Sequence, residues 1–326
     1  MHLIKIPLRI PILGGGTDIK SWYQKNGSFF VSAAINKYIY ISGHQRLSDN
    51  LIWLSYSKNE IVENIKDIKH EILREILKMY KSNHGIEIHS ISDLPSHSGL
   101  GSSGSFTVGS LILMNNIFNY KKSLQSIAET AIDLNINKLG KNSGKQDEYI
   151  AAFGGVKSFN IQKNGMTKVK KFKIKNLKEF DNNLYLFNTE RGSSEVMLSL
   201  IAKNHKKSNE VYLKNINIVS KEMRSILLSG KIDEYGKLLD EHWKIKKSFS
   251  KKMSNSKTDE LYDQLKKFGA TGGKIIGAGG GGCFLCYVPK KNNINFKKKI
   301  HKLKITSIPF SLFDDNEECA LQTYNI

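Results

Sequence analysis

The sequence contains few cysteines, and their spacing argues against a metal or redox site. Only three occur among 326 residues, and two of them form the motif Cys283-Phe284-Leu285-Cys286. A structural zinc would need a second ligand pair at suitable spacing, and none accompanies this pair. Alternation along a strand would also place Cys283 and Cys286 on opposite faces. We therefore expect small buried side chains at both positions.

Long apolar runs are absent as well. No stretch reaches the ~18 consecutive apolar residues of a membrane-spanning helix. The first seven residues, Met-His-Leu-Ile-Lys-Ile-Pro, have neither the apolar core nor the cleavage site of a signal peptide. We therefore expect no membrane partner and a cytoplasmic location.

Acidic residues are scarce relative to basic ones. The chain has 30 Asp and Glu against 50 Lys and Arg, a formal net charge of +20, which favours nucleic-acid binding. The lysines are scattered among Asn and Ile, however, and the densest cluster, residues 168–178, alternates with apolar residues as an exposed strand does. We therefore expect no nucleic-acid partner and regard attraction of anionic ligands as a secondary benefit. Nucleic-acid binding remains an alternative function that rests on the net charge alone.

The length of the chain predicts two domains, because single domains usually have about 100–200 residues. We place these domains at residues 1–160 and 161–326. Alternation and helical spacing predict strands at 28–42 and 51–56, helices at 66–80, 193–228 and 231–249, and an irregular tail at 289–326 with one strand at 304–312.

The stretch Leu-Pro-Ser-His-Ser-Gly-Leu-Gly-Ser-Ser-Gly-Ser at residues 94–105 is the most informative segment. The alternating residues 86–91 predict a strand before it, and the apolar run from Phe106 predicts a buried helix after it. Small residues let an anion approach the backbone, and the unpaired N–H groups and dipole at a helix start favour negative charge. The stretch therefore predicts a phosphate-binding loop; a Ser/Gly-rich helix start without a ligand stays open.

Two familiar phosphate loops do not fit this stretch. Its glycines, Gly99-x-Gly101-x-x-Gly104, match the dinucleotide fingerprint formally, but no acidic residue for the ribose follows about 20 positions later. The Gly-Lys-Ser/Thr of a Walker A loop is also missing.

Two more glycine-rich segments flank candidate site residues. Gly14-Gly15-Gly16 precedes Thr17 and Asp18, and Asp18 is either the N-cap of a short helix or a ligand of sugar hydroxyls. The segment Gly-Ala-Gly-Gly-Gly-Gly at 277–282 lies between two apolar runs, which indicates a backbone turn packed against a ligand.

A pair of adjacent acids, Asp147 and Glu148, follows a glycine in the segment Gly-Lys-Gln-Asp-Glu-Tyr at residues 144–149. Adjacent side chains point to different faces of any regular structure, so at most one of the two enters a site. A helix N-cap role for Asp147 stays open.

The three glycine-rich segments together resemble the motifs of the GHMP kinases, the superfamily of galactokinase, homoserine kinase, mevalonate kinase and phosphomevalonate kinase. The matching segments are Pro7-Leu8-Arg9-Ile10 with Gly14 to Asp18, Pro95 to Ser103, and Lys274 to Gly282. The resemblance runs from residue 4 to about residue 288. Within the superfamily, Gly-Gly-Gly-Thr-Asp and Gly-Lys-Gln-Asp-Glu-Tyr-Ile-Ala-Ala-Phe-Gly-Gly most resemble the D-glycero-D-manno-heptose 7-phosphate kinases, which transfer phosphate from ATP to the anomeric C1 hydroxyl.

The resemblance implies a two-domain α+β GHMP kinase fold: an N-terminal S5-domain-2-like α/β domain with the ATP loop, and a ferredoxin-like C-terminal domain, with the site between them. Asp147 matches the catalytic aspartate, which accepts or orients the proton of the attacking hydroxyl. Arg9 matches the basic residue that neutralises the transferring phosphoryl group. Such chemistry depends mainly on positioning and charge.

The resemblance also implies ligands for ATP, sugar and Mg²⁺. The residues implied to bind the ATP phosphates are Pro95, Ser98, Gly99, Leu100, Gly101, Ser102 and Ser103. The residues implied to bind the sugar are Gly15, Gly16, Thr17, Asp18, Gly279 and Gly280. Those implied to bind Mg²⁺ are Ser103 and Asn135. We add Arg191 as a ligand of the sugar's own phosphate, because it precedes a predicted helix start; a surface ion pair is the alternative.

Two positions depart from the family pattern. Asn135 stands where relatives usually carry a Mg²⁺-binding glutamate, and an amide is a weaker magnesium ligand. His97 stands where relatives usually carry a small residue, and is either a ligand contact or a surface group. The other functions left open are a GHMP kinase for another sugar or small alcohol, such as a hexose or mevalonate, and a non-catalytic GHMP-like protein. A homodimer is also left open.

Overall fold

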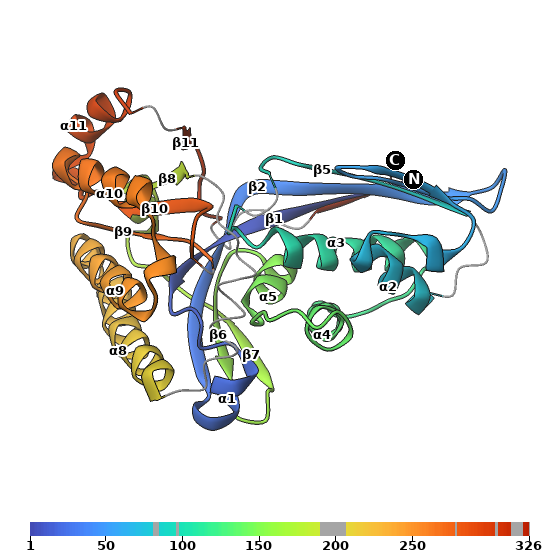
Figure 1. The fold of residues 1–326 in the computed structure, drawn as a ribbon, viewed down its shortest axis with the longest axis horizontal. Coiled ribbons are helices and arrows are strands. Elements are labelled where there is room, and N and C mark those ends of the chain that lie inside the picture. The colour runs from blue at the N-terminus through green and yellow to red at the C-terminus, as the bar shows by residue number, and fades with distance from the viewer. Residues whose placement is uncertain are drawn as a thin grey trace.

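The computed structural model contains two antiparallel-rich sheets with helices packed against them, which confirms the predicted α+β class (Figure 1). It describes residues 1–80, 85–95, 98–189, 207–277, 279–303, 306–313 and 322–325.

The first sheet has eight strands, in the order β12-β1-β2-β5-β3-β4, with β6 paired to β2 and β7 to β6. Every pairing is antiparallel except β3 with β5. The strands are β1 (His2–Leu13), β2 (Ser28–Arg46), β3 (Ile52–Ser55), β4 (Asn59–Val62), β5 (Gly85–Ser92), β6 (Val156–Ile161), β7 (Thr167–Lys171) and β12 (Gln322–Asn325).

Helices α2 to α5 lie together on one side of this sheet (Figure 1). Helix α3, which is the predicted apolar helix, is buried along most of its length and contacts β1, β2, α4 and α5. Its central position explains why apolar and small residues occur on every face of the helix. The helices of this half are α1 (Lys20–Asn26), η1 (Ile65–Asp67), α2 (Glu71–Tyr80), α3 (Ser102–Ile117), α4 (Leu124–Asp133), the π-helical η2 (Leu134–Lys138) and α5 (Gln146–Phe153).

The second sheet is antiparallel, with the order β11-β8-β10-β9. Its strands follow the chain as β-α-β-β-α-β, which is the ferredoxin-like arrangement that was predicted. They are β8 (Leu184–Asn188), β9 (Gly272–Ile275), β10 (Cys283–Tyr287) and β11 (Ser307–Ile308). The helices are α6 (Leu177–Asn182), α8 (Lys207–Ser229), η3 (Ile232–Glu234), α9 (Tyr235–Phe249), η4 (Lys251–Met253), α10 (Ser256–Phe268) and α11 (Lys290–Ile300).

The predicted domain boundary between residues 160 and 161 falls inside β6 (Val156–Ile161). That strand pairs with β2 and β7, so the first sheet continues to Lys171. The chain also returns to the first sheet at its end, where β12 pairs with β1 and both termini lie side by side (Figure 1). Alternation in the sequence identified strands but carried no information about which strands pair.

Several predicted elements also differ from the structure. Helix α11 (Lys290–Ile300) occupies part of the tail that was expected to be irregular, and β11 covers only Ser307–Ile308. Helix α2 begins at Glu71 rather than at residue 66. The predicted helix at 193–228 corresponds to α8, with its first residues outside the described part.

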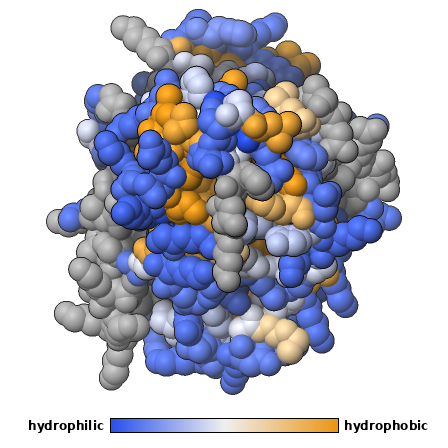
Figure 2. All heavy atoms as spheres, turned by 90° about the vertical axis from the view of Figure 1, so that its right-hand side faces the viewer, coloured by the Kyte–Doolittle hydropathy of each residue, from blue (hydrophilic) through white to orange (hydrophobic). Residues whose placement is uncertain are grey.

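None of the helices in the described ranges has the length and apolar character to cross a membrane. The end of the molecule on the right of Figure 1 is covered largely by hydrophilic groups, with apolar groups between them (Figure 2). Cys283 and Cys286 are both buried on β10, as expected of small core side chains.

Candidate active site

Two of the glycine-rich segments touch each other directly. A Cβ atom added to Gly99 would lie 2.6 Å from the carbonyl oxygen of Ile276, and one added to Gly277 would lie 3.0 Å from the Cα of Gly99. Both glycines also have positive φ, at +79° and +76°. Only glycine permits so close a backbone approach. This contact joins a loop of the first domain to a turn of the second.

The loop before α3 presents the free N–H groups of a helix start. Gly101 adopts the left-handed conformation at the N-cap of α3, and Ser102 and Ser103 form its first turn with no side-chain cap. The Ser103 side chain is exposed, and the Lys141 Nζ donates to its Oγ at 3.4 Å. An unfilled helix start next to a lysine favours an anion.

The other residues of this loop differ in their exposure. Leu100 is fully buried in the core, and its carbonyl accepts from the Arg9 backbone N–H at 3.0 Å. Ser98 is buried, and its Oγ has no hydrogen-bond partner within the described ranges. Pro95 is exposed, whereas His97 lies outside the described residues. Leu100 therefore anchors the loop, while Ser102 is half-buried and Ser103 is exposed at the start of α3.

Arg9 and Asp147 form a bonded pair, although 138 residues separate them. The guanidinium Nε and Nη2 lie 2.7 and 2.6 Å from Asp147 Oδ1, and Nη1 donates to the Gly99 carbonyl at 2.7 Å. A Cβ on Gly101 would lie 3.1 Å from Arg9 Cγ, and one on Gly104 would lie 2.7 Å from Asp147 Cβ. The glycines therefore let the start of α3 close onto this pair.

Asp147 and Glu148 point to different faces of α5, as predicted. The Asp147 side chain is 33% exposed, whereas Glu148 is only 2% exposed. The N-cap of α5 is Lys145, so Asp147 is not a helix N-cap and lies in the first turn. Asp147 is therefore the acid that faces the site.

Asp18 binds the start of α5 rather than its own helix. Its Oδ2 accepts from the backbone N–H groups of Lys145 at 2.9 Å and Gln146 at 3.1 Å. The N-cap of α1 is Ile19, so the expected N-cap alternative for Asp18 is wrong. Burial raises the pKa of Asp18, and these backbone hydrogen bonds oppose that shift. Asp18 thus ties the first glycine segment to the loop that carries Asp147.

Among the residues that precede Asp18, some are buried and others face open space. Thr17 is 3% exposed, and its Oγ1 lies 2.8 Å from Ser28 Oγ. A Cβ on Gly15 would meet nothing within 4 Å, so this backbone faces open space. Gly16 would meet only Leu213, at 3.4 Å. Of the expected sugar contacts in this segment, the backbone at Gly15 is therefore the most accessible.

The third glycine segment is held against η4. Gly280 N–H donates to the Met253 carbonyl at 3.2 Å, and a Cβ on Gly279 would lie 2.7 Å from Met253 Sδ. Gly279 also faces Lys246, whose Cε would be 3.5 Å from that Cβ. Arg191, expected to bind the sugar's phosphate, lies outside the described residues.

Asn135 is 2% exposed on η2 and forms a buried pair with Glu148. Its Nδ2 donates to Glu148 Oε1 at 2.8 Å and to Thr107 Oγ1 at 3.2 Å. Asn135 Oδ1 and Glu148 Oε2 have no partner in the described part of the chain. Burial, followed by the charge of Asp147, raises the pKa of Glu148 to about 7. A carboxylate is therefore present beside position 135, although it comes from α5.

Three basic residues that were not among the predicted site residues lie behind the third glycine segment. Lys246 and His242 lie on α9, Lys274 lies on β9, and all three are buried. His242 Nε2 lies 3.2 Å from the Gly14 carbonyl. The only available signal was a lysine inside the apolar run Lys274-Ile275-Ile276 before the glycines, where burial of a charge is unusual.

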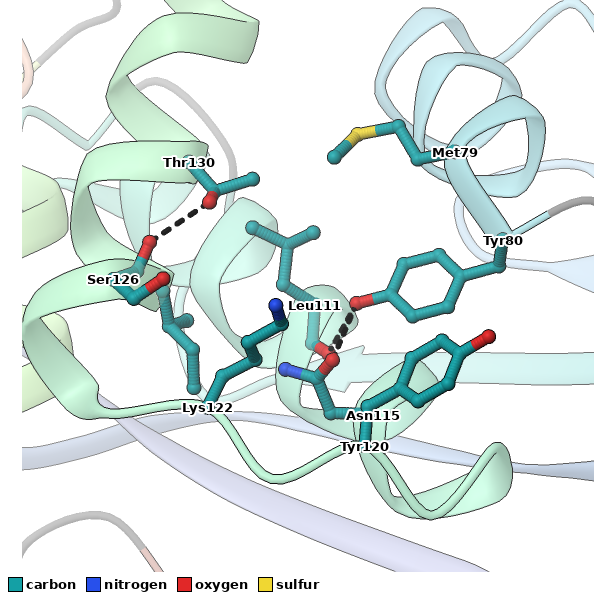
Figure 3. Close-up of a pocket in the computed structure, with 9 residues that line it drawn as sticks. Met79, Tyr80, Leu111, Asn115, Tyr120, Lys122, Ser126 and Thr130 are labelled. Atoms are coloured by element: carbon teal, nitrogen blue, oxygen red, sulfur yellow. Dashed lines mark hydrogen bonds between the residues drawn. The ribbon is translucent and has the colours of Figure 1, made fainter.

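A separate cavity of about 320 Å³ lies at the far end of α3 (Figure 3). Leu111 and Asn115 line it from α3, and Tyr80 of α2 donates its hydroxyl to Asn115 Oδ1 at 2.8 Å. At 1.5 Å per helical residue, these α3 residues lie roughly 13–20 Å along the helix from Ser102. The cavity is therefore distinct from the site around Arg9 and Asp147.

Comparison with known protein families gives two matches along the chain. The family model of the GHMP kinase N-terminal domain matches residues 55–155. The model of the GHMP kinase C-terminal domain matches residues 223–303. The first match contains the loop before α3 and Asp147, and the second contains Lys246, Lys274 and the glycines of 277–282.

Individual relatives extend the similarity over nearly the whole chain. The D-glycero-alpha-D-manno-heptose 7-phosphate kinase of Campylobacter jejuni is 28% identical over 317 residues, covering 91% of this chain and 92% of the relative. The mevalonate kinase of Pyrococcus furiosus is 23% identical and covers 75% and 72%. The crystal structure of a D-glycero-D-manno-heptose 1-phosphate kinase from Bacteroides thetaiotaomicron superposes with a TM-score of 0.79 at 21% identity, covering 100% and 99%.

Proposed function

Since this chain belongs to the GHMP kinases and is an ATP-dependent sugar kinase of that family, we propose that its acceptor is the anomeric C1 hydroxyl of D-glycero-D-manno-heptose 7-phosphate. The product is then the 1,7-bisphosphate. The relative that supports this acceptor is similar over 91% of the chain. The observation that carries the proposal is the Arg9–Asp147 pair held against the glycine-rich start of α3.

Asp147 acts on the sugar hydroxyl in this proposal. Its carboxylate is partly exposed, while the guanidinium that orients it is 6% exposed. A carboxylate within hydrogen-bond reach of a hydroxyl accepts or orients its proton as the oxygen attacks phosphorus. Arg9 orients the carboxylate through its two contacts to Oδ1 and offers positive charge to the phosphoryl group in transit.

The start of α3 binds the ATP phosphates in this proposal. Ser102 and Ser103 lie in the first turn of α3, which has no side-chain cap, and Lys141 lies beside Ser103. The buried hydroxyl of Ser98 supplies a further polar group. Pro95 and Leu100 shape the loop rather than contact the phosphates.

Magnesium fits the oxygen donors near this loop. Mg²⁺ prefers oxygen ligands and takes one or two carboxylates together with substrate phosphates. Ser103 Oγ, Asn135 Oδ1 and Glu148 Oε2 are the candidates, since the last two are buried oxygens without a partner in the described ranges. When bound, the ion would neutralise charge on the phosphates. Glu148 would supply the charge that Asn135 lacks.

The sugar lies against the first and third glycine segments in this proposal. Gly15 and Gly16 offer backbone groups, and Gly279 and Gly280 form the opposite wall. Asp18 and Thr17 support this segment from inside, through the α5 start and Ser28. Asp18 therefore acts mainly by positioning.

The proposal is tested by ADP release with a panel of acceptors. The panel contains heptose 7-phosphate, heptose 1-phosphate, the unphosphorylated heptose, galactose and mevalonate. We expect the highest kcat/KM with the 7-phosphate, lost in Asp147→Asn. A higher kcat/KM with mevalonate or galactose would show that the acceptor is that of another GHMP kinase and not the heptose phosphate. Equal use of unphosphorylated heptose would exclude a dedicated phosphate pocket.

A further inference from the structure

Three positively charged side chains converge behind the candidate active site. Arg9 comes from β1 of the first sheet, Lys246 from α9 and Lys274 from β9 of the second domain. They are 5%, 7% and 2% exposed, respectively. Lys246 donates to the carbonyls of Ile275, which follows Lys274, and of Gly277. Gly277 packs on Gly99, whose carbonyl accepts from Arg9. The cluster, defined as Arg9, Lys246 and Lys274, therefore joins the two domains.

The contacts of the two lysines leave positive charge uncompensated. Lys246 Nζ donates to the carbonyls of Gly277 at 2.7 Å and Ile275 at 3.2 Å. Lys274 makes no side-chain hydrogen bond or ion pair with any residue of the described ranges. The only carboxylate bonded to the cluster within those ranges is Asp147, through Arg9. With both lysines protonated, the cluster and Asp147 together carry an excess of two positive charges.

The position of the cluster relates it to both substrates. Lys246 binds the Gly277 turn, which packs on Gly99 of the ATP loop. One helical turn earlier on α9, His242 contacts the carbonyl of Gly14 in the first glycine segment. Gly279 packs closely between Lys246 and Met253, because its added Cβ would lie 3.5 Å from the lysine Cε and 2.7 Å from Met253 Sδ. The cluster thus lies at the contact between the second and third glycine-rich segments, and the helix that carries Lys246 also touches the first.

Burying lysines without an anion is costly, so their presence calls for an explanation. Desolvation lowers the pKa of Lys246 to about 7, with Arg9 adding to the effect. The same causes, together with Lys246, lower the pKa of Lys274 to about 7. Methionine or leucine would fill the same space without this cost.

We infer that Arg9, Lys246 and Lys274 form one anion site that binds a phosphate dianion between the two domains. A phosphate monoester carries about two negative charges near neutral pH, which matches the excess of the cluster. The inference rests on the proposed function for the identity of the ligand, which is either the terminal phosphoryl group of ATP or the sugar's own phosphate. Both sources present the same chemistry to the cluster.

Binding of a dianion at this site must draw protons onto the lysines. The charged and titratable groups that face them are Arg9 from β1, Asp147 from α5 behind it, and His242 from α9. Burial and the two lysines hold the pKa of His242 well below its usual range, so the histidine stays neutral. At pH 8 the lysines are mostly neutral in the free protein, and an adjacent dianion favours their charged form.

The decisive experiment is calorimetric titration of the full chain with inorganic phosphate at pH 8, in two buffers of different ionisation enthalpy. We expect uptake of about one to two protons per phosphate bound, since each lysine gains one. Phosphate that bound only at the start of α3 would take up no proton there, and this result would overturn the inference. The measurement uses the unaltered protein, so it does not depend on the folding of a variant.

Variants then assign the uptake to the cluster. Lys246→Met and Lys274→Met should each weaken phosphate binding by about tenfold or more and reduce proton uptake, because a charge-assisted contact is lost. The control is Lys267→Met on α10, an exposed lysine with no contact in the described ranges, which should behave as the wild type. Unchanged phosphate affinity in both buried variants would overturn the inference.

Two further arms separate the sources of the phosphate. Proton uptake with adenosine 5′-(β,γ-imido)triphosphate but not with ADP would assign the site to the transferred group. Uptake with heptose 7-phosphate but not with the free heptose would assign it to the sugar's phosphate. If heptose 7-phosphate is not phosphorylated but inorganic phosphate still draws protons, only the proposed acceptor fails. If the sugar is phosphorylated without proton uptake in any arm, only the anion site fails.

Discussion

Arg9 holds Asp147 through one carboxylate oxygen. Both guanidinium contacts, at 2.7 and 2.6 Å, fall on Oδ1. The other oxygen, Oδ2, has no hydrogen bond to any residue in the described ranges. A carboxylate oriented on one side keeps its second oxygen available for a substrate hydroxyl, which is the arrangement that a general base requires.

Asp147→Asn should lower turnover by about two to four orders of magnitude, the usual effect of removing an acid–base group. ATP affinity and thermal stability should stay near wild type, because the amide keeps the size of the side chain. Steady-state kinetics and equilibrium nucleotide binding measure the two effects. Asp67→Asn, an exposed acid on η1, is the matched control. Near-normal turnover in Asp147→Asn would remove this residue from the chemistry.

Gly144→Ala should damage both stability and turnover, because its Cβ would lie 2.2 Å from Asp18 Cγ. Asp18 would have to leave the N–H groups of Lys145 and Gln146, which set the direction of α5. Overpacking of this kind costs about 1–3 kcal/mol of unfolding free energy. Asn142→Ala, at an exposed position in the same loop, should change neither quantity. A Gly144→Ala enzyme with normal kcat would show that Asp18 does not position Asp147.

Lys246→Met should stabilise the ligand-free protein in a pH-dependent way. The folded-state pKa of about 7 lies below the ordinary lysine value, so the unfolded chain binds more protons between about pH 7 and 10.5. Wild-type stability therefore rises with pH across that window. The variant's advantage should be about 5 kcal/mol at pH 6 and fade as the pH rises past about 10.5, as shown by denaturant unfolding. An advantage independent of pH would mean that the lysine is not buried as a charge.

Asn135→Glu should destabilise the protein on its own, because the new carboxylate would face Glu148 Oε1, now 2.8 Å from the Asn135 amide. The double variant Asn135→Glu/Glu148→Gln keeps one carboxylate and one amide in the pair. We expect it to recover the melting temperature of the wild type. If the single variant were as stable as the wild type, the two side chains would not form the pair described.

The glycine-rich segments made much of the site predictable from the sequence. Glycines at 14–16, 99–104 and 277–282 indicated close backbone approaches, and Asp147 and Arg9 followed from the motifs around them. The contact between Gly99 and Ile276, however, depends on two sheets meeting, which local periodicity does not encode. Strand pairing is equally non-local, so the return of β12 to β1 was missed.

The buried basic cluster was unpredictable for a related reason. Lysine is normally exposed, so Lys246 looked like one more surface charge on an amphipathic helix. Only the packing of α9 on β9 shows that it points inward. Asn135 looked like a loss of charge, and the compensating Glu148 became visible only when α5 and η2 were seen in contact.

In the proposed reaction, this chain transfers the terminal phosphoryl group of ATP to the C1 hydroxyl of heptose 7-phosphate. Phosphorus NMR of a reaction with ATP and heptose 7-phosphate tests it most directly. The account predicts a new anomeric phosphate resonance that grows with ADP, while the 7-phosphate resonance is retained, and neither change with Asp147→Asn. ADP formation without an anomeric phosphate, or phosphorylation at another hydroxyl, would contradict it.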